Sequence, residues 1–259
     1  MKSLFSTLFI IILNSSLFSQ YDLDSLWNIW QDSSLSDTIR SEALEDYIYD
    51  GFFNTDPDSA IFYSKELYEF NRKSNNEIGL VNTLRLEAYI NFRMGKYSKA
   101  LGSYQKGLDI AKSIDYKEGI GDILLKIGYL YHDNEDVPRA LDYYQQSLEI
   151  FEDIGERDGI GSVYNEFGSI YRAEREYVKA LDYYLKSIAI NNEIDNDDSN
   201  AAMFLNIGSL YLDQEDFEKA LDYFQQGLVI YEKFGDKLGI ASGLAGIGNV
   251  YGDKGDLDN

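Results

Sequence analysis

The 259-residue sequence has no cysteine, one histidine and two prolines. The lack of cysteine excludes disulfides, thiolate nucleophiles and cysteine-ligated zinc sites. The single histidine, His132, leaves no histidine pair for a metal and weakens any case for a Ser-His-Asp triad. We therefore expect a protein that is not an enzyme, with no catalytic residue, no metal and no cofactor.

Basic residues are also scarce, because 23 Lys and Arg face 45 Asp and Glu for a net charge of −22. Such a surface repels polyphosphate, so we expect no nucleic-acid partner and no docking on an anionic membrane. Aromatic residues, at 15% of the chain, supply the buriable surface that a disordered acidic chain lacks. The sequence thus favours a packed protein whose partner is a neutral or basic protein or peptide segment.

The N-terminus predicts export. Met1-Lys2 precedes an uncharged apolar run over residues 4–13 and a small polar stretch. This layout is typical of a secretory signal peptide, here residues 1–19 with cleavage after Ser19, although an uncleaved anchor is the alternative. A helix that crosses a bilayer needs an apolar run of about 18 residues or more, and none occurs in 20–259, so we expect no membrane span there. The expected location is periplasmic or secreted.

A regular repeat organises the rest of the chain. Alanines recur every 40 residues, so that aligned repeats share a column made of Ala60, Ala100, Ala140, Ala180 and Ala220. A second column, one predicted helix earlier, reads Ile48, Ala88, Gly128, Gly168, Gly208 and Gly248. Four residues after the alanines stand Ser64, Tyr104, Tyr144, Tyr184 and Phe224. Spacings of three and four place these residues on helical faces, so each repeat predicts two helices.

The unit Leu124-x-x-Ile127-Gly128-x-x-Tyr131, followed by Ala140-x-x-x-Tyr144, resembles the tetratricopeptide repeat. The resemblance implies an all-α fold, a right-handed α-solenoid of antiparallel helix pairs. The small residue of the first helix is then expected beside the aromatic residue of the second. Because the repeat of this chain exceeds the family's usual length of about 34 residues, we expect the extra length in a longer second helix and its turn.

A further column predicts where each second helix ends. It reads Asn75, Asp115, Gly155, Asp195 and Gly235, residue types that accept a left-handed backbone. Acidic residues such as Asp136 and Asp216 precede the second helices and are expected to cap them.

The repeat defines the domain organisation. Residues 20–40 are expected to form an N-terminal helical cap and residues 41–259 the array. Its members are a degenerate repeat at 41–80, clear repeats at 81–120, 121–160, 161–200 and 201–240, and an incomplete one at 241–259. Since the last repeat has only its first helix, we expect an N-terminal fragment of a longer protein, or self-association through that helix.

Proteins of this family bind extended segments in a concave groove lined by the first helices. The side chains expected there are Asn82, Arg85, Tyr89, Arg93, Tyr129, His132, Asn165, Ser169, Arg172, Asn206, Ser209 and Asn249. Asparagine can both donate to and accept from a peptide backbone, and arginine can grip a carboxylate. The chaperone-type carboxylate clamp of the family is not present, because Tyr89, Ser162 and Glu166 stand at its positions.

Two functions follow from this reading. The first is a non-catalytic protein-protein interaction scaffold that binds a peptide or partner segment. The alternative is the extracytoplasmic sensory region of a signalling receptor, a histidine kinase, nucleotide cyclase or transcription regulator, whose membrane span and output domain would follow residue 259.

Overall fold

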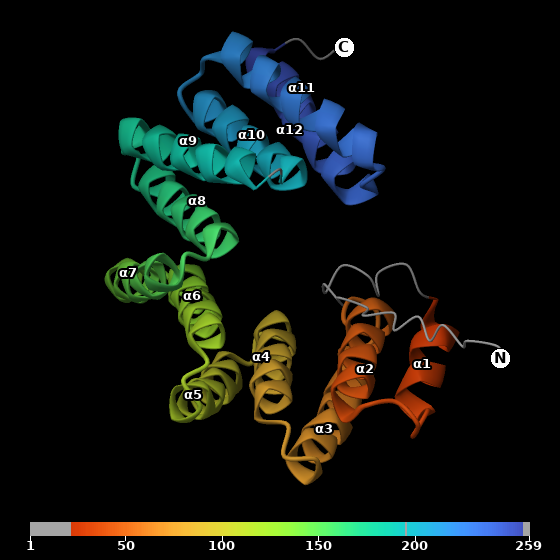
Figure 1. Cartoon of the computed structure of the whole chain (residues 1–259). Helices are drawn as coiled ribbons and strands as arrows, with labels where there is room; N and C mark the ends of the chain where they lie inside the picture. Colours follow the sequence, from red (N-terminus) through yellow and green to blue (C-terminus); the bar gives the residue numbers. More distant parts are fainter. Residues whose placement is uncertain (1–21, 195, 256–259) are drawn as a thin grey trace, which may run out of the picture. The chain divides into compact units, whose positions relative to one another are not determined.

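A computed structural model describes residues 22–194 and 196–255, so the expected signal peptide and Asp195 lie outside the described residues. The described chain is all α-helical, with no strand (Figure 1). Its helices are α1 (Leu23–Gln31), α2 (Asp37–Gly51), α3 (Pro57–Lys73), α4 (Glu77–Arg93), α5 (Tyr97–Ser113), α6 (Lys117–Asp133), α7 (Val137–Ile154), α8 (Arg157–Ala173), α9 (Tyr177–Glu193), α10 (Asp197–Asp213), α11 (Phe217–Phe234) and α12 (Lys237–Lys254). None of these helices combines the length and the apolar character needed to cross a membrane.

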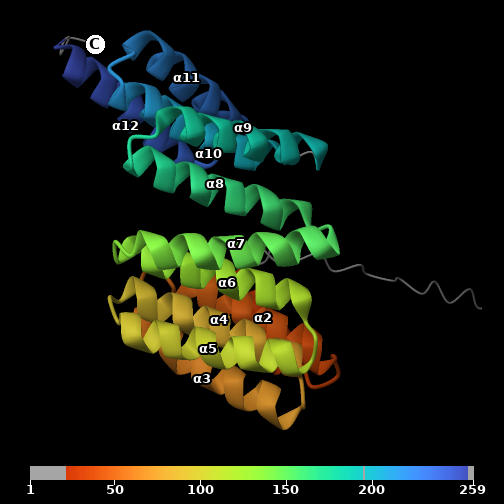
Figure 2. The same ribbon diagram turned by 90° about the vertical axis from the view of Figure 1, so that its left-hand side faces the viewer.

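The chain divides into two compact units, residues 1–110 and 111–259. In the first unit α1 packs on α2, α2 on α3, and α3 on α4, around a core that includes Trp30, Leu44 and Leu67. In the second unit the helices form the pairs α6/α7, α8/α9 and α10/α11, and α12 packs against α11 and α10. Figure 2 shows α8, α9 and α10 stacked side by side. Each unit is thus a stretch of α-solenoid made of antiparallel helix pairs.

The expected pairing of small and aromatic residues closes each helix pair of the second unit. A Cβ atom placed on Gly128 or Gly168 would lie 2.5 Å from the ring of Tyr144 or Tyr184, respectively. On Gly208 it would lie 2.8 Å from the ring of Phe224. Because real Cβ atoms do not approach other atoms so closely, only glycine allows the two helices to meet at this distance. The prediction from the repeat columns is confirmed.

The predicted helix-ending column is confirmed where the structure describes it. Asn75, Asp115, Gly155 and Gly235 have φ angles of 54°, 53°, 70° and 73°. A second left-handed column, in the turn between the two helices of the later repeats, was not predicted, because three of its five members are charged residues that give no sign of it. Its members are Gly95, Glu135, Arg175, Glu215 and Gly255. Non-glycine residues in this conformation are uncommon, so the pattern shows that the turn geometry overrides residue preference here.

The capping prediction holds in part. The carboxylate of Asp136 accepts a hydrogen bond from the backbone N–H of Arg139, and that of Asp216 from the N–H of Lys219. Glu176, at the same position before α9, makes no such bond, since its carboxylate pairs with Lys179 instead.

The expectation of a longer second helix is wrong. In the second unit the first helices α6, α8 and α10 have 17 residues, and the second helices have 17 or 18. The first helices begin at residues 117, 157 and 197, four residues before the boundaries set from the sequence. Side-chain caps stabilise two of these starts, since Glu156 accepts from the backbone N–H of Asp158 and Asn196 from that of Ser199, whereas α6 begins after Tyr116 without such a bond. The extra length is therefore shared by both helices.

Candidate functional site

Polar side chains line one face of α8 and the neighbouring part of α10. We call this surface the polar face and define it by Asn165, Glu166, Ser169, Arg172, Asn206 and Ser209. All six are half-buried, and they recur at steps of three and four residues. This spacing places them along one side of each helix, beside the apolar stripe that forms the core.

Hydrogen bonds join these side chains across three helices. The Nδ2 of Asn206 donates to the Oδ1 of Asn165 at 2.8 Å. The Nδ2 of Asn165 donates to the Oε1 of Glu166 at 3.2 Å, and the hydroxyl of Tyr144 on α7 donates to the other carboxylate oxygen, Oε2, at 3.2 Å. The chain of bonds thus connects α10, α8 and α7 and fixes the two amides side by side.

Glu166 is the acidic residue at the centre of these hydrogen bonds. Burial raises the pKa of its carboxyl, while the hydrogen bond from Tyr144 and the charge of Lys126 act in the opposite direction. The same burial, together with the neighbouring charge of Glu166, raises the pKa of Tyr144. The tyrosine hydroxyl therefore stays protonated and remains a hydrogen-bond donor to the carboxylate.

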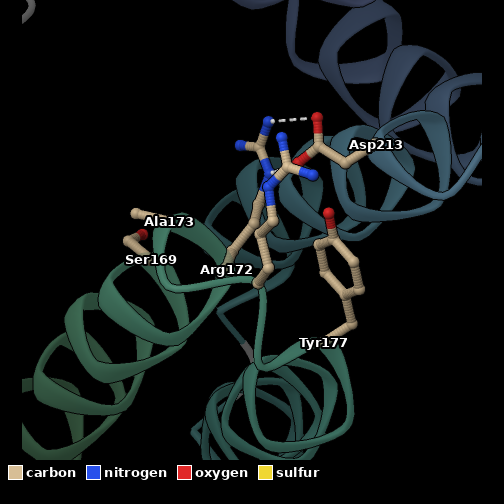
Figure 3. Close-up of a pocket in the computed structure, with 6 residues that line it drawn as sticks. Ser169, Arg172, Ala173, Tyr177 and Asp213 are labelled. Atoms are coloured by element: carbon tan, nitrogen blue, oxygen red, sulfur yellow. Dashed lines mark hydrogen bonds and ion pairs between the residues drawn. The ribbon is translucent and has the colours of Figure 1, made fainter.

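A pocket of about 420 Å³ opens at the C-terminal end of α8. It is lined by Ser169, Arg172, Ala173, Arg175, Tyr177 and Asp213. The Arg172 guanidinium and the Asp213 carboxylate point toward one another, and the side chain of Tyr177 lies near them (Figure 3). Arg172 donates from Nε to Oδ2 of Asp213 at 2.6 Å, with a longer second contact of 3.4 Å. This two-pronged contact holds the arginine in place at the end of the polar face.

The hydroxyl of Ser169 contacts Tyr184, one of the aromatic residues that recur in the repeats. Ser169 Oγ lies 3.4 Å from the hydroxyl of Tyr184, the aromatic partner of Gly168. The fully buried Tyr184 ring therefore links the core packing to the polar face, because it fixes where its hydroxyl meets Ser169.

The structure brings together five of the residues expected in a groove. Asn165 and Asn206 are bonded, Ser169 and Arg172 line the pocket, and Ser209 lies half-buried on α10. Three others lie elsewhere in the second unit. Tyr129, on α6, has 42% of its surface exposed, and Asn249 is exposed on α12.

His132, another of the expected residues, lies half-buried at the end of α6. Burial lowers its pKa, and the neighbouring Asp133 opposes this shift. The imidazole is therefore neutral near pH 7, so it contributes hydrogen-bonding groups but no charge.

The expected residues of the first unit lie on α4 and make contacts within that unit. Arg85 forms an ion pair with Glu45 of α2 at 4.0 Å. The ring of Tyr89 stacks on Phe53 with centroids 4.8 Å apart, and the guanidinium of Arg93 lies 5.4 Å from the same ring. Asn82 is half-buried on the same helix. These contacts tie α4 to the segment that follows α2.

Two residues of the site were missed by the sequence analysis. Glu166 shares a repeat column with Lys126 and Asn206, and a column that is polar in three successive repeats was a usable signal. Asp213 follows Arg172 at a distance of about one repeat along the chain, a pairing that the repeat makes possible but that no spacing rule singles out.

A family model described as tetratricopeptide repeat matches residues 119–193 and 199–259, more than half of the chain. The chain belongs to the tetratricopeptide repeat family. The helix pairs, the glycine and tyrosine columns and the turn geometry described above agree with this membership. Proteins with this fold are typical interaction scaffolds. No curated protein sequence matches the chain significantly.

Solved structures with the same fold share little sequence with this tetratricopeptide repeat chain. BtubC from P. vanneervenii is 19% identical, with a TM-score of 0.62 over 83% of this chain and 85% of that one. A signal transduction ATPase with a tetratricopeptide repeat sensor from Pyrococcus horikoshii is 21% identical, with a TM-score of 0.63 over 90% of this chain and 36% of that one. A putative kinesin light chain from Podosopora anserina, with nearly identical repeats, is 14% identical, with a TM-score of 0.56 over 78% and 99%. At these identities the likeness concerns the fold alone.

Proposed function

We propose that the protein is a non-catalytic scaffold that binds an extended segment of a partner protein along the polar face. The observation that carries this proposal is the bonded amide pair of Asn165 and Asn206 on adjacent first helices. Their mutual bond uses one donor of Asn206 and one lone pair of Asn165, the bond to Glu166 uses one donor of Asn165, and an asparagine amide has two donors and two lone pairs. The remaining groups suit the alternating N–H and C=O of an extended backbone.

The net charge of the chain restricts which partner segments are favoured. At a net charge of −22, long-range attraction favours a neutral or basic segment and disfavours an acidic one. The pocket at Arg172 lies at one end of the face and offers space for a side chain or a chain end.

The test uses peptides of defined sequence. A random dodecapeptide library displayed on phage is selected on immobilised protein, and the enriched peptides are synthesised with a fluorescent label. We expect the double variant Asn165→Ala/Asn206→Ala to weaken binding at least about tenfold in fluorescence polarisation, since two backbone contacts are lost. Gln146→Ala, an exposed amide on α7, is the matched control and should leave affinity unchanged. Unchanged affinity in the double variant would place the binding surface elsewhere.

A sensory role in a signalling receptor is the second candidate. It is supported by the fold shared with the tetratricopeptide repeat sensor of the Pyrococcus horikoshii ATPase, of which this chain spans 36%. It also accords with the export that residues 1–19 predict. Reading the coding frame beyond Asn259 tests it, because a receptor requires an apolar span of about 20 residues followed by an output domain. Cell fractionation of a tagged chain tests the exported location.

Self-association through the last repeat belongs to the same proposal. A Cβ on Gly248 would meet nothing within 4 Å, and Leu244 is 54% exposed, so this face of α12 is open in the described residues. Sedimentation analysis of the protein and of a Leu244→Glu variant would detect a dimer formed through this helix and its loss.

A further inference from the structure

Glu166 has neutral partners on both of its carboxylate oxygens. The hydroxyl of Tyr144 and the amide of Asn165 each donate to it at 3.2 Å. Charge-assisted hydrogen bonds are shorter, about 2.5–2.9 Å, so neither contact is a strong one. A carboxylate has about four lone-pair sites, and these two bonds occupy two of them. The group therefore keeps capacity for further donors.

The cations near Glu166 do not pair with it. Among the ion pairs of the described residues, none includes Glu166, and Arg172, six residues further along α8, is already bonded to Asp213. Lys126 on α6 is exposed and acts on Glu166 through its charge without reaching ion-pair distance. A half-buried carboxylate thus stands in the middle of the polar face with no cation of its own.

From this geometry we infer that Glu166 receives the ammonium or guanidinium group of a lysine or arginine in the bound segment. The inference rests on the proposed function and names the chemistry of one position within it. The free lone pairs supply the acceptors, and an incoming cation would offset the cost of burying the carboxylate. The adjoining amide pair would hold the backbone beside it.

The repeat columns show why this subsite would also set the register of the segment. At the position of Glu166, the preceding repeat carries Lys126 and the following repeat carries Asn206. A basic side chain placed one repeat away would therefore meet a like charge or a neutral amide. Of these three alignments, only one pairs the cation with a carboxylate, and like-charge contact disfavours the shift toward α6.

The experiment combines the selected peptides with a substitution of nearly unchanged shape. The dodecapeptide library is selected in parallel on the wild-type protein and on Glu166→Gln, which keeps the side-chain volume and an oxygen acceptor. Enriched peptides are then synthesised with each lysine or arginine, or with norleucine or citrulline in its place. Glu149→Gln, on an exposed part of α7, changes the net charge equally and serves as the control.

We expect peptides enriched on the wild type to share one lysine or arginine at a common position. Replacing it should weaken binding at least about tenfold to the wild type and to Glu149→Gln, and less than about threefold to Glu166→Gln, because the pair is already broken. Enriched peptides without a common basic residue, or an equal loss on both proteins, would overturn this inference and leave the scaffold function standing. If no peptide is enriched, the proposed function itself fails.

Discussion

The first repeat and the repeat formed by α8 and α9 solve the same packing problem in opposite ways. In α8/α9 the small residue Gly168 lies on the first helix and the large Tyr184 on the second. In α2/α3 the large residue, Ile48, lies on the first helix and the small one, Ser64, on the second. Ile48, Ser64 and Tyr184 are all fully buried. The helix pair therefore requires complementary volumes across the interface, and either helix can supply the larger side chain.

The two repeats also differ in charge on their first helices. The α2 helix carries Glu42, Glu45, Asp46 and Asp50, whereas α8 carries two carboxylates, Asp158 in its first turn and Glu166, which is bonded to the amide of Asn165. Burial raises the pKa of Asp46 to about 7, and the charges of Glu45 and Asp50 add to the effect. Burial also raises the pKa of Glu45, and the charge of Arg85 opposes that shift. The neighbouring carboxylates of α2 thus add to the burial that raises the pKa of Asp46, whereas burial alone raises the pKa of Glu166.

The largest effect is expected from breaking the packing of the regular repeat. Gly168→Ile places a branched side chain where even a Cβ would lie 2.5 Å from the Tyr184 ring, and should lower the free energy of unfolding by about 3 kcal/mol. Adding Tyr184→Ser recreates the arrangement of the first repeat and should recover part of the loss. Urea unfolding monitored by circular dichroism measures both. Gly102→Ile, where a Cβ meets nothing within 4 Å, is the control and should not destabilise.

The second-largest change in stability is expected from neutralising one carboxylate of the first unit. Because the folded pKa of Asp46 is raised to about 7, its stability contribution is complete below the unfolded value of 3.8 and is lost as the pH rises through 7. Asp46→Asn should therefore stabilise more at pH 8 than at pH 5, by about 1–2 kcal/mol after allowance for solvent screening. Urea titrations at the two pH values give the difference, and an equal gain at both would contradict the assignment.

A smaller effect should come from Asn200, a polar residue in a column that is apolar in four other repeats. Asn200 is 5% exposed and its Oδ1 has no hydrogen-bond partner, although Leu80, Ile120, Ile160 and Ile240 occupy the same position in other repeats. Asn200→Ile removes an unsatisfied polar atom from the interior and should raise stability by about 1 kcal/mol. Thermal melting measures the gain. Removal of its exposed bonding partner by Asn192→Ala should change little, and a loss on Asn200→Ile would show that the amide is needed.

The smallest effect concerns the turn inside each repeat. The first unit has Gly95 at φ 70° where the second has Glu135 at φ 60°. Glu135→Gly should stabilise the second unit by about 0.5 kcal/mol, because relief of the left-handed strain slightly exceeds the entropy that glycine adds to the unfolded chain. Asn134→Gly, at φ −89°, should instead destabilise it in the same melting assay. Equal responses would show that the turn carries no strain.

The main features of the fold were predictable because they recur. The regular period reveals helix pairs, and the alignment of Gly128, Gly168 and Gly208 with their aromatic partners predicts which side chains meet across each pair. The left-handed turn at Glu135 was not predictable, since nothing in a charged residue indicates a positive φ. The start of each first helix was missed for a related reason, because helix ends depend on backbone geometry as well as on residue type.

The sequence by itself determined the repeat, the helix pairs, their small and large contacts and the acidic surface, because each of these depends on local periodicity or on composition. Only the tertiary structure decided which polar residues form the site. Asn165 meets Asn206, and Arg172 meets Asp213, across 41 residues in each case. Glu166 is left with neutral partners. These contacts depend on how one helix pair is rotated against the next, and that rotation is set by the packing of whole side chains.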